Sequence, residues 1–343
     1  MTPEQLSILW FVILGFFLAG YAILDGFDLG VGILHPFIAR TDHDRRINLN
    51  AIGPIWDGNE VWLIVYGGVL FAAFPEAYAT VFSGFYLAFM LALLGLIVRA
   101  VSLEFRSKLQ SPGWRRFWDW GFFASSLLAT LIFGVAVGNA MIGIPLDKRG
   151  LYTGSFLDLL TFYPILVALL TISMFVMHGS LYLQLKTPPG AMHSRVKRIA
   201  WYGWAVFFVL YVVTTIVTLD TVPRAVTNVR HYPWGGIFVL VAILAIVNTA
   251  RSIRKDQDLQ AFLSSCLTIV SFVALFSMAL YPNIVTSNPE PTNSLTIFNA
   301  ASSPGTLWIM TIIGVIGTPL VLAYTFAVYW TFRGRVQLDD HSY

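Results

Sequence analysis

The chain has 343 residues, of which 57% are hydrophobic and 11% are charged. Soluble domains carry about 25% charged residues, so this composition excludes an ordinary soluble protein and favours a membrane as the solvent. The formal net charge of +3 is small, and the lysines and arginines fall in short segments between apolar runs. A separate basic domain that would bind nucleic acid is therefore excluded.

Nine apolar runs are long enough for a membrane helix, which needs about 20 residues. They cover residues 6–38, 52–74, 78–102, 118–143, 160–185, 199–219, 234–251, 261–283 and 306–332. Strong period-two alternation is absent, which disfavours a β-barrel. The predicted fold is therefore all-α and polytopic, with nine transmembrane helices in a single integral membrane domain over residues 1–343.

The basic residues predict the orientation of these helices. Of the 21 lysines and arginines, 16 fall in the odd-numbered loops and the C-terminal tail, four fall in the even-numbered loops, and Arg99 lies inside the third span. Basic residues concentrate on the cytoplasmic side, so the N-terminus is predicted outside and the C-terminus in the cytoplasm. The longest loop, residues 284–305, is polar and is predicted to form a small ordered cap on the outer face.

Two further features of the apolar runs need comment. GxxxG spacing occurs at Gly26/Gly30 and at Gly134/Gly138. It allows close helix approach but often arises by chance in glycine-rich membrane helices, so it receives little weight here. The N-terminal run is preceded by Glu4 and by no basic segment, which predicts a permanent helix rather than a signal peptide.

Ionisable residues inside the spans are the most informative feature, because charges at bilayer depth are costly and usually functional. Asp25 and Asp28 lie in the first span, Asp57 and Glu60 in the second, and Arg99 in the third. One interpretation is a hydrated cytoplasmic proton route through Asp25, Asp57 and Glu60. The alternative is an ion-paired knot, in which Arg99 neutralises Asp28 or Asp57 and joins the helices.

Two acids lie nearer the membrane surface. Glu104, at the end of the third span, is a candidate for the same ion-pair and assembly group as Asp28 and Arg99. For both Glu104 and Asp119, which opens the fourth span, a solvated helix end is the favoured interpretation.

The histidines argue against haem ligation by this chain. His178 is the one histidine deep in a span and has no obvious partner at its depth, so it is predicted to be a buried polar contact. His35 lies near the inner end of the first span, and the others fall in predicted loops or the tail, namely His43, His193, His231 and His341. No nucleotide, zinc or iron–sulfur motif is present, so we predict neither a metal site nor a directly catalytic residue.

Two sequence runs carry a family resemblance. DGFDLGVG at residues 25–32 and WDGNEVWL at residues 56–63 resemble the first- and second-helix signatures of subunit II of cytochrome bd-type quinol oxidases. Similar matches continue at residues 82–86, 99–101, 105–108, 118–121 and 138–139, and in the last span with Pro319 and Tyr324. The resemblance runs nearly end to end and is looser between the fifth and eighth spans.

The resemblance implies a respiratory complex of the bacterial cytoplasmic (inner) membrane that oxidises quinol outside and reduces oxygen to water with cytoplasmic protons. Haem b and haem d are ligated by subunit I, and some members hold a structural quinone in subunit II. The implied partners are subunit I, a small single-helix accessory subunit, quinol and membrane lipid. Subunit II has two four-helix bundles plus one helix, with Asp57 on a proton path and Asp28 and Arg99 serving assembly and haem retention.

Two other functions remain to be weighed. A proton-coupled secondary transporter would carry matching broken helices in two halves, whereas the acids here crowd into the first third of the chain. A purely structural scaffold would need Asp57 only for assembly.

Overall fold

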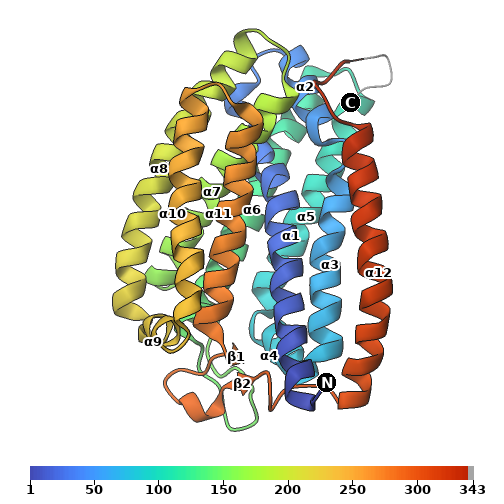
Figure 1. Cartoon of the computed structure of the whole chain (residues 1–343). Helices are drawn as coiled ribbons and strands as arrows, with labels where there is room; N and C mark the ends of the chain where they lie inside the picture. The colour runs from blue at the N-terminus through green and yellow to red at the C-terminus, as the bar shows by residue number, and fades with distance from the viewer. Residues whose placement is uncertain (339–343) are drawn as a thin grey trace.

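The computed structural model describes residues 1–338, so the predicted tail residue His341 lies outside the described part. Long helices run side by side along one axis, and α1 and α12 begin at the same end of the bundle (Figure 1). The long helices are α1 (Pro3–Ile38), α3 (Trp56–Ala73), α5 (Tyr86–Phe105), α6 (Pro112–Ile142), α7 (Phe162–Lys186), α8 (Ala191–Thr221), α10 (Gly236–Arg254), α11 (Asp258–Leu280) and α12 (Pro304–Thr331). The shorter elements are α2 (Asp42–Ile52), α4 (Pro75–Gly84), α9 (Pro223–His231), η1 (Arg106–Lys108), η2 (Leu157–Leu159), η3 (Pro233–Gly235), η4 (Pro291–Asn293), β1 (Asn283–Val285) and β2 (Leu295–Thr296).

Within residues 1–338, eight helices are long and apolar enough to cross a membrane. They are all the long helices except α3, which has 18 residues and carries Asp57, Asn59 and Glu60 in its first two turns. These polar groups lower its hydropathy, so the ninth predicted crossing stays a prediction. The all-helical, multi-spanning architecture is confirmed.

The third predicted span, residues 78–102, is divided between two helices. Pro75 opens α4, and α4 ends at Gly84. Phe85 leaves the helical region, with φ −99° and ψ 21°, and α5 starts afresh at Tyr86. The helix able to cross the membrane therefore lies further along the chain than the hydropathy pattern placed it.

α2 occupies a segment that the hydropathy pattern predicts to be a loop. Its N-terminus carries a capping box, in which Thr41 accepts from the Asp44 amide while Asp44 accepts from the Thr41 amide. The helix buries Ile47, Leu49 and Ile52 against the bundle. Its low hydropathy concealed it, because only one face is apolar.

α1 is the central helix and packs on α3, α6, α7 and α11. A Cβ atom added at Gly30 would overlap the carbonyl oxygen of Phe175, so α1 and α7 cross almost backbone to backbone. Gly134 and Gly138 of α6 face the α7 backbone in the same way. Both GxxxG motifs thus include real packing positions, and the low weight assigned to them was wrong.

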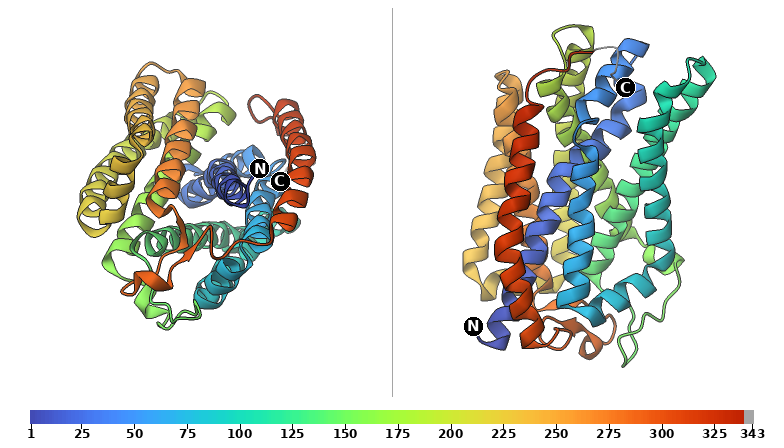
Figure 2. Two further views of the ribbon diagram at one scale, coloured as in Figure 1. Left: turned by 60° about the horizontal axis from the view of Figure 1, so that its bottom comes forward. Right: turned by 90° about the vertical axis from the view of Figure 1, so that its right-hand side faces the viewer.

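α12 differs from the other long helices. It packs on α1 and α3, and only 6% of its most apolar stretch is buried, compared with 67% for α7. It lies at the edge of the bundle in the left view of Figure 2 and in front of the other helices in the right view. The segment that leads into it, residues 284–305, is ordered as predicted and, together with Asn283, forms the antiparallel pair β1–β2.

Candidate functional site

Two groups of charged and polar side chains are buried between the helices. The first, which we call the embedded cluster, comprises Asp25 and Asp28 of α1, Asn59 and Glu60 of α3, and Arg99 of α5. Asp25, Asp28 and Arg99 are completely buried. The structure therefore brings three predicted carboxylates and the one predicted arginine together across three helices.

Arg99 pairs with acids other than the predicted ones. Its Nη2 atom lies 2.6 Å from Asp25 Oδ1, and the same nitrogen contacts Glu60 Oε1. The predicted pairs with Asp28 or Asp57 are wrong, because helix rotation turns Asp28 toward Asn59 and leaves Asp57 on the outer surface of α3. An ion-paired cluster exists, but with different members.

Asp28 is held through hydrogen bonds instead. Asn59 Nδ2 donates to Asp28 Oδ2 at 2.8 Å, and the hydroxyl of Tyr329 donates to Asn59 Oδ1 at 2.9 Å. These two hydrogen bonds join α1, α3 and α12. Sequence reasoning missed Tyr329, since nothing in the last span distinguishes it from the other aromatic residues there, such as Tyr324 and Trp330.

The embedded cluster has more acid than base. Both carboxylate oxygens of Asp25, Oδ1 of Asp28, and Nε and Nη1 of Arg99 have no hydrogen-bond partner among residues 1–338. The 2.6 Å contact between Asp25 and Arg99 is thus an ion pair without good hydrogen-bond geometry. Buried polar atoms of this kind are normally satisfied by ordered water, so the site suits hydration and proton exchange.

The acids also differ in exposure. Asp57 is exposed, the Glu60 side chain is 21% exposed, and Asp25 is completely buried. Asp57 and Glu60 lie three residues apart on α3, within one helical turn. Glu104, also predicted as a site residue, is half-buried in the last turn of α5.

The second group, which we call the end cluster, lies where α1 ends, α2 packs and α6 begins. Asp119 Oδ1 accepts from His35 Nε2 at 2.8 Å and from Arg106 Nε at 2.5 Å. Asp119 Oδ2 accepts from Arg45 Nη1 at 2.8 Å. Asp119 is only 3% exposed, so the prediction of a solvated helix end was wrong. Its partners are distant in sequence, which hid the network.

α2 supplies one edge of the end cluster. Asp42, Arg45 and Asn48 recur every three residues on one helical face. Asp42 binds Arg106 at 2.8 Å and Arg115 at 2.9 Å. Partial burial raises the pKa of Asp42, but the hydrogen bond from Arg106 and the charges of both arginines outweigh it, and the pKa is lowered overall.

His35 completes the end cluster. Asn48 Nδ2 lies 2.8 Å from His35 Nδ1. With the amide as donor, Nδ1 is the acceptor and Nε2 carries the hydrogen that is donated to Asp119. Both ring nitrogens are therefore used inside the protein.

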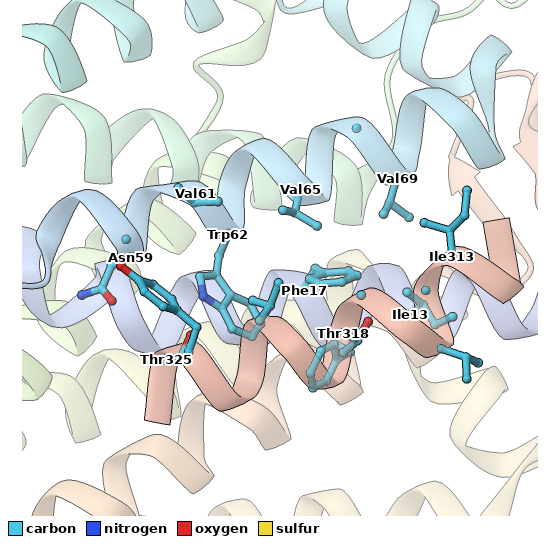
Figure 3. Close-up of a pocket in the computed structure, with 18 of the residues that line it drawn as sticks. Ile13, Phe17, Asn59, Val61, Trp62, Val65, Val69, Ile313, Thr318 and Thr325 are labelled. Atoms are coloured by element: carbon cyan, nitrogen blue, oxygen red, sulfur yellow. The ribbon is translucent and has the colours of Figure 1, made fainter. Parts of the chain in front are cut away.

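An apolar cleft of about 710 Å³ lies between α1, α3 and α12. Figure 3 shows side chains of α3 and α12 facing each other across it, with Ile13 and Phe17 of α1 between them. Trp62, Val65 and Val69 come from α3. Asn59, which holds Asp28, lines the same cleft.

Comparison with known proteins decides the family. Residues 6–332 match the family model described as cytochrome bd terminal oxidase subunit II. The chain belongs to this family. It is 35% identical to cytochrome bd-I ubiquinol oxidase subunit 2 of Escherichia coli strain K12, with 98% of this chain and 97% of the relative covered. It is 32% identical to cytochrome bd ubiquinol oxidase subunit 2 of Bacillus subtilis strain 168, with 97% of each covered.

The fold agrees with that assignment. The bd oxidase structure from Geobacillus thermodenitrificans superposes with a TM-score of 0.80 at 15% sequence identity, covering 96% of this chain and 98% of the other. The protein is thus a multi-pass inner-membrane subunit of a bd-type terminal oxidase, an oxidoreductase complex that contains haem and a subunit I. This decides against the transporter alternative.

The two buried histidines, His35 and His178, do not fit the role of haem ligands. His178 is completely buried, with Nδ1 2.7 Å from Ser265 Oγ and Nε2 3.0 Å from the carbonyl oxygen of Ile23. Its ring stacks on Phe262 with a centroid distance of 4.9 Å. The prediction of a buried polar contact is confirmed. His178 and His35 have both nitrogens engaged by protein groups, so neither presents a nitrogen to an iron.

Proposed function

We propose that this subunit supports quinol oxidation and the reduction of oxygen to water by stabilising the haem-bearing subunit I and by contributing a cytoplasmic proton pathway. Haem b and haem d are ligated by subunit I, and a small single-helix accessory subunit completes the complex. The names of the relatives, which are ubiquinol oxidases, support quinol as the electron donor.

The proposed topology has nine crossings, with the N-terminus outside and the C-terminus in the cytoplasm. α3 is the crossing that is added to the eight helices that qualify by length and hydropathy. α1–α3–α5–α6 and α7–α8–α10–α11 form two four-helix bundles, and α12 is the extra helix. The concentration of basic residues in the odd-numbered loops and the C-terminal tail supports this orientation. The embedded and end clusters then both lie toward the cytoplasm.

The observation that carries the proton pathway is the graded exposure of its acids. A proton enters at Asp57 on the surface, passes to Glu60, and reaches Asp25 beside Arg99. The partnerless polar atoms of Asp25 and Arg99 provide places for bridging waters. Carboxylate and water chains of this kind carry protons in membrane machines.

Asp28, Arg99 and Glu104 are proposed to serve assembly rather than transfer. Arg99 holds two acids from different helices, and Asp28 is tied through Asn59 to α12. A guanidinium with such partners fixes α1, α3 and α5 relative to one another.

The docking face for subunit I is proposed to be formed by α3, α5 and α12. Each presents a row of exposed apolar side chains, such as Ile64, Leu94 and Ile313. Asp57 lies on this same side of α3, which would place the start of the pathway at the subunit boundary.

The cleft between α1, α3 and α12 is the proposed site for a structural quinone. Its apolar lining fits an isoprenoid chain, and Thr318 and Thr325 offer hydroxyl groups to a head group. Lipid acyl chains would use the same apolar surface.

The test of the pathway is Asp57→Asn in the whole complex. We expect oxygen consumption per haem to fall about tenfold, equivalent to about 1.4 kcal/mol in the barrier, while haem content stays normal. Glu76→Gln, an exposed acid in the first turn of α4, is the matched control and should turn over normally. Normal turnover of Asp57→Asn would exclude the pathway and leave the scaffold role.

A further inference from the structure

A basic cavity opens at the end of the bundle where α8 begins and α10 ends, at the top of Figure 1. It is wide open at the surface, has a volume of about 350 Å³ and belongs to neither cluster described above. Its polar and aromatic lining consists of Ser194, Lys197, Arg198 and Trp201 of α8, Arg254 of α10, and Asp256 of the turn that follows.

The cavity carries unbalanced positive charge. Lys197 is paired with Asp256. Arg198 and Arg254 are exposed and have no carboxylate partner within residues 1–338. Arg251 and Lys255 add two more cations in the last turn of α10 and just after it. The cavity therefore attracts an anion.

An aromatic ladder starts at the cavity and continues along α8. The Arg254 guanidinium carbon lies 4.6 Å from the centre of the Trp201 ring. Trp201 stacks on Trp204 at 5.4 Å, and Trp204 stacks on Phe208 at the same distance. Tryptophan prefers the membrane–water interface, so the arginine lies at head-group depth and Phe208 lies deeper.

The surface beside the ladder is apolar and exposed. Val206 and Val209 of α8 and Leu244 and Val247 of α10 are each more than half exposed. These side chains lie within helices that qualify as membrane spans. A molecule with a negative head and hydrocarbon chains would contact the cavity and this surface together.

We propose that the cavity binds the phosphate head group of an anionic phospholipid, with its acyl chains along the α8–α10 face. Arg198 and Arg254 hold the phosphate, and Trp201 contacts the glycerol region. In the proposed orientation this lipid belongs to the cytoplasmic leaflet. Free phosphate shares the head-group chemistry but leaves the aromatic ladder and the apolar face unused, which is why the lipid is favoured.

The experiment uses the assembled complex in phosphatidylcholine vesicles that contain a small fraction of photoactivatable phosphatidylglycerol. Cross-links are mapped to peptides by mass spectrometry. The wild type should be labelled at residues 194–209 and 240–256, and photoactivatable phosphatidylcholine should label these peptides much less. The double variant Arg198→Gln/Arg254→Gln should lose about tenfold or more of the phosphatidylglycerol labelling, because each cation near an anionic head group contributes about fivefold.

Two further variants keep the result interpretable. Arg40→Gln/Lys108→Gln removes two exposed cations, one just after α1 and one at the end of η1, and should label like the wild type. Arg198→Lys/Arg254→Lys keeps the charge and should retain most of the labelling. The haem spectrum of every variant verifies assembly.

Three outcomes would overturn the proposal. The Arg198→Gln/Arg254→Gln variant could be labelled as strongly as the Arg40→Gln/Lys108→Gln control. Photoactivatable phosphatidylcholine could also label the same peptides as strongly as phosphatidylglycerol. Millimolar inorganic phosphate could also abolish the labelling, which would identify a free-phosphate site instead.

Discussion

The embedded cluster and the end cluster are both buried, and both join helices far apart in sequence, yet their charges are balanced differently. In the embedded cluster, Asp25 and Glu60 share the single guanidinium of Arg99, and Asp28 is held by the Asn59 amide instead of by a cation. In the end cluster, Asp119 is surrounded by Arg45, Arg106 and His35, and Asp42 by two arginines.

This difference separates two uses of buried charge. A carboxylate whose oxygens all accept hydrogen bonds from fixed cations has no reason to take up a proton, so the end cluster serves to hold α2 against α1 and α6. A cluster with excess carboxylate and partnerless atoms gains by taking up a proton or water. The embedded cluster is therefore the better candidate for proton movement.

The largest effect should come from Arg99→Ala. This change leaves Asp25 completely buried and Glu60 largely buried without their cation, and breaking a buried pair costs about 3–5 kcal/mol. We expect little assembled, haem-loaded complex, measured as yield and absorbance after purification. Arg333→Ala, an exposed arginine just after α12, is the control and should assemble normally. Normal yield and spectra of Arg99→Ala would refute the structural role of the embedded cluster.

Asp119→Asn should cost somewhat less, because α2 keeps its apolar contacts. Arg106 is 1% exposed and would lose its ion pair with Asp119 at 2.5 Å while keeping the one with Asp42, so we expect a destabilisation of about 3 kcal/mol. Thermal unfolding of the complex would measure it. Asp158→Asn removes an exposed carboxylate and should change stability by less than about 1 kcal/mol.

The same variant sharpens the comparison between the clusters. Turnover per haem of Asp119→Asn should equal that of the wild type once the complex is assembled. A loss of turnover at unchanged stability would mean that the end cluster also conducts protons.

The sequence predicted most of the residues of the embedded cluster but not which of them form ion pairs. Charged residues in apolar runs stand out, so Asp25, Asp28, Glu60 and Arg99 were identified as site residues. Depth along the helix can be estimated from hydropathy, but rotation about the helix axis cannot be fixed within one turn. Arg99 was therefore assigned to Asp28 or Asp57 instead of Asp25 and Glu60.

The end cluster was missed for a different reason. His35, Asp42 and Asp119 lie in or beside what hydropathy presents as ordinary loops and helix ends. Only the packing of α2 on the bundle brings them together, and α2 itself was assigned to a loop. The Thr41–Asp44 capping box and the three-residue spacing of Asp42, Arg45 and Asn48 were the available signals.

The smallest expected effect concerns Asp42, at the outer edge of the end cluster. Its pKa in the folded protein is lowered below the ordinary value of 3.8, with the Arg106 hydrogen bond and the Arg106 and Arg115 charges overcoming partial burial. The unfolded chain therefore takes up the proton first. The stability contributed by Asp42 is fully present above pH 3.8 and is lost as the pH falls through the folded pKa.

The side chain is 44% exposed, so solvent screening limits this contribution to less than about 1 kcal/mol. Thermal unfolding of the wild type and Asp42→Asn should differ near neutral pH and converge as the pH falls below 3.8. High salt should also reduce the difference, because the pair is partly exposed. A constant difference at every pH would mean that Asp42 acts through its hydrogen-bonding shape rather than its charge, and that only Asp119 gives the end cluster its ionic character.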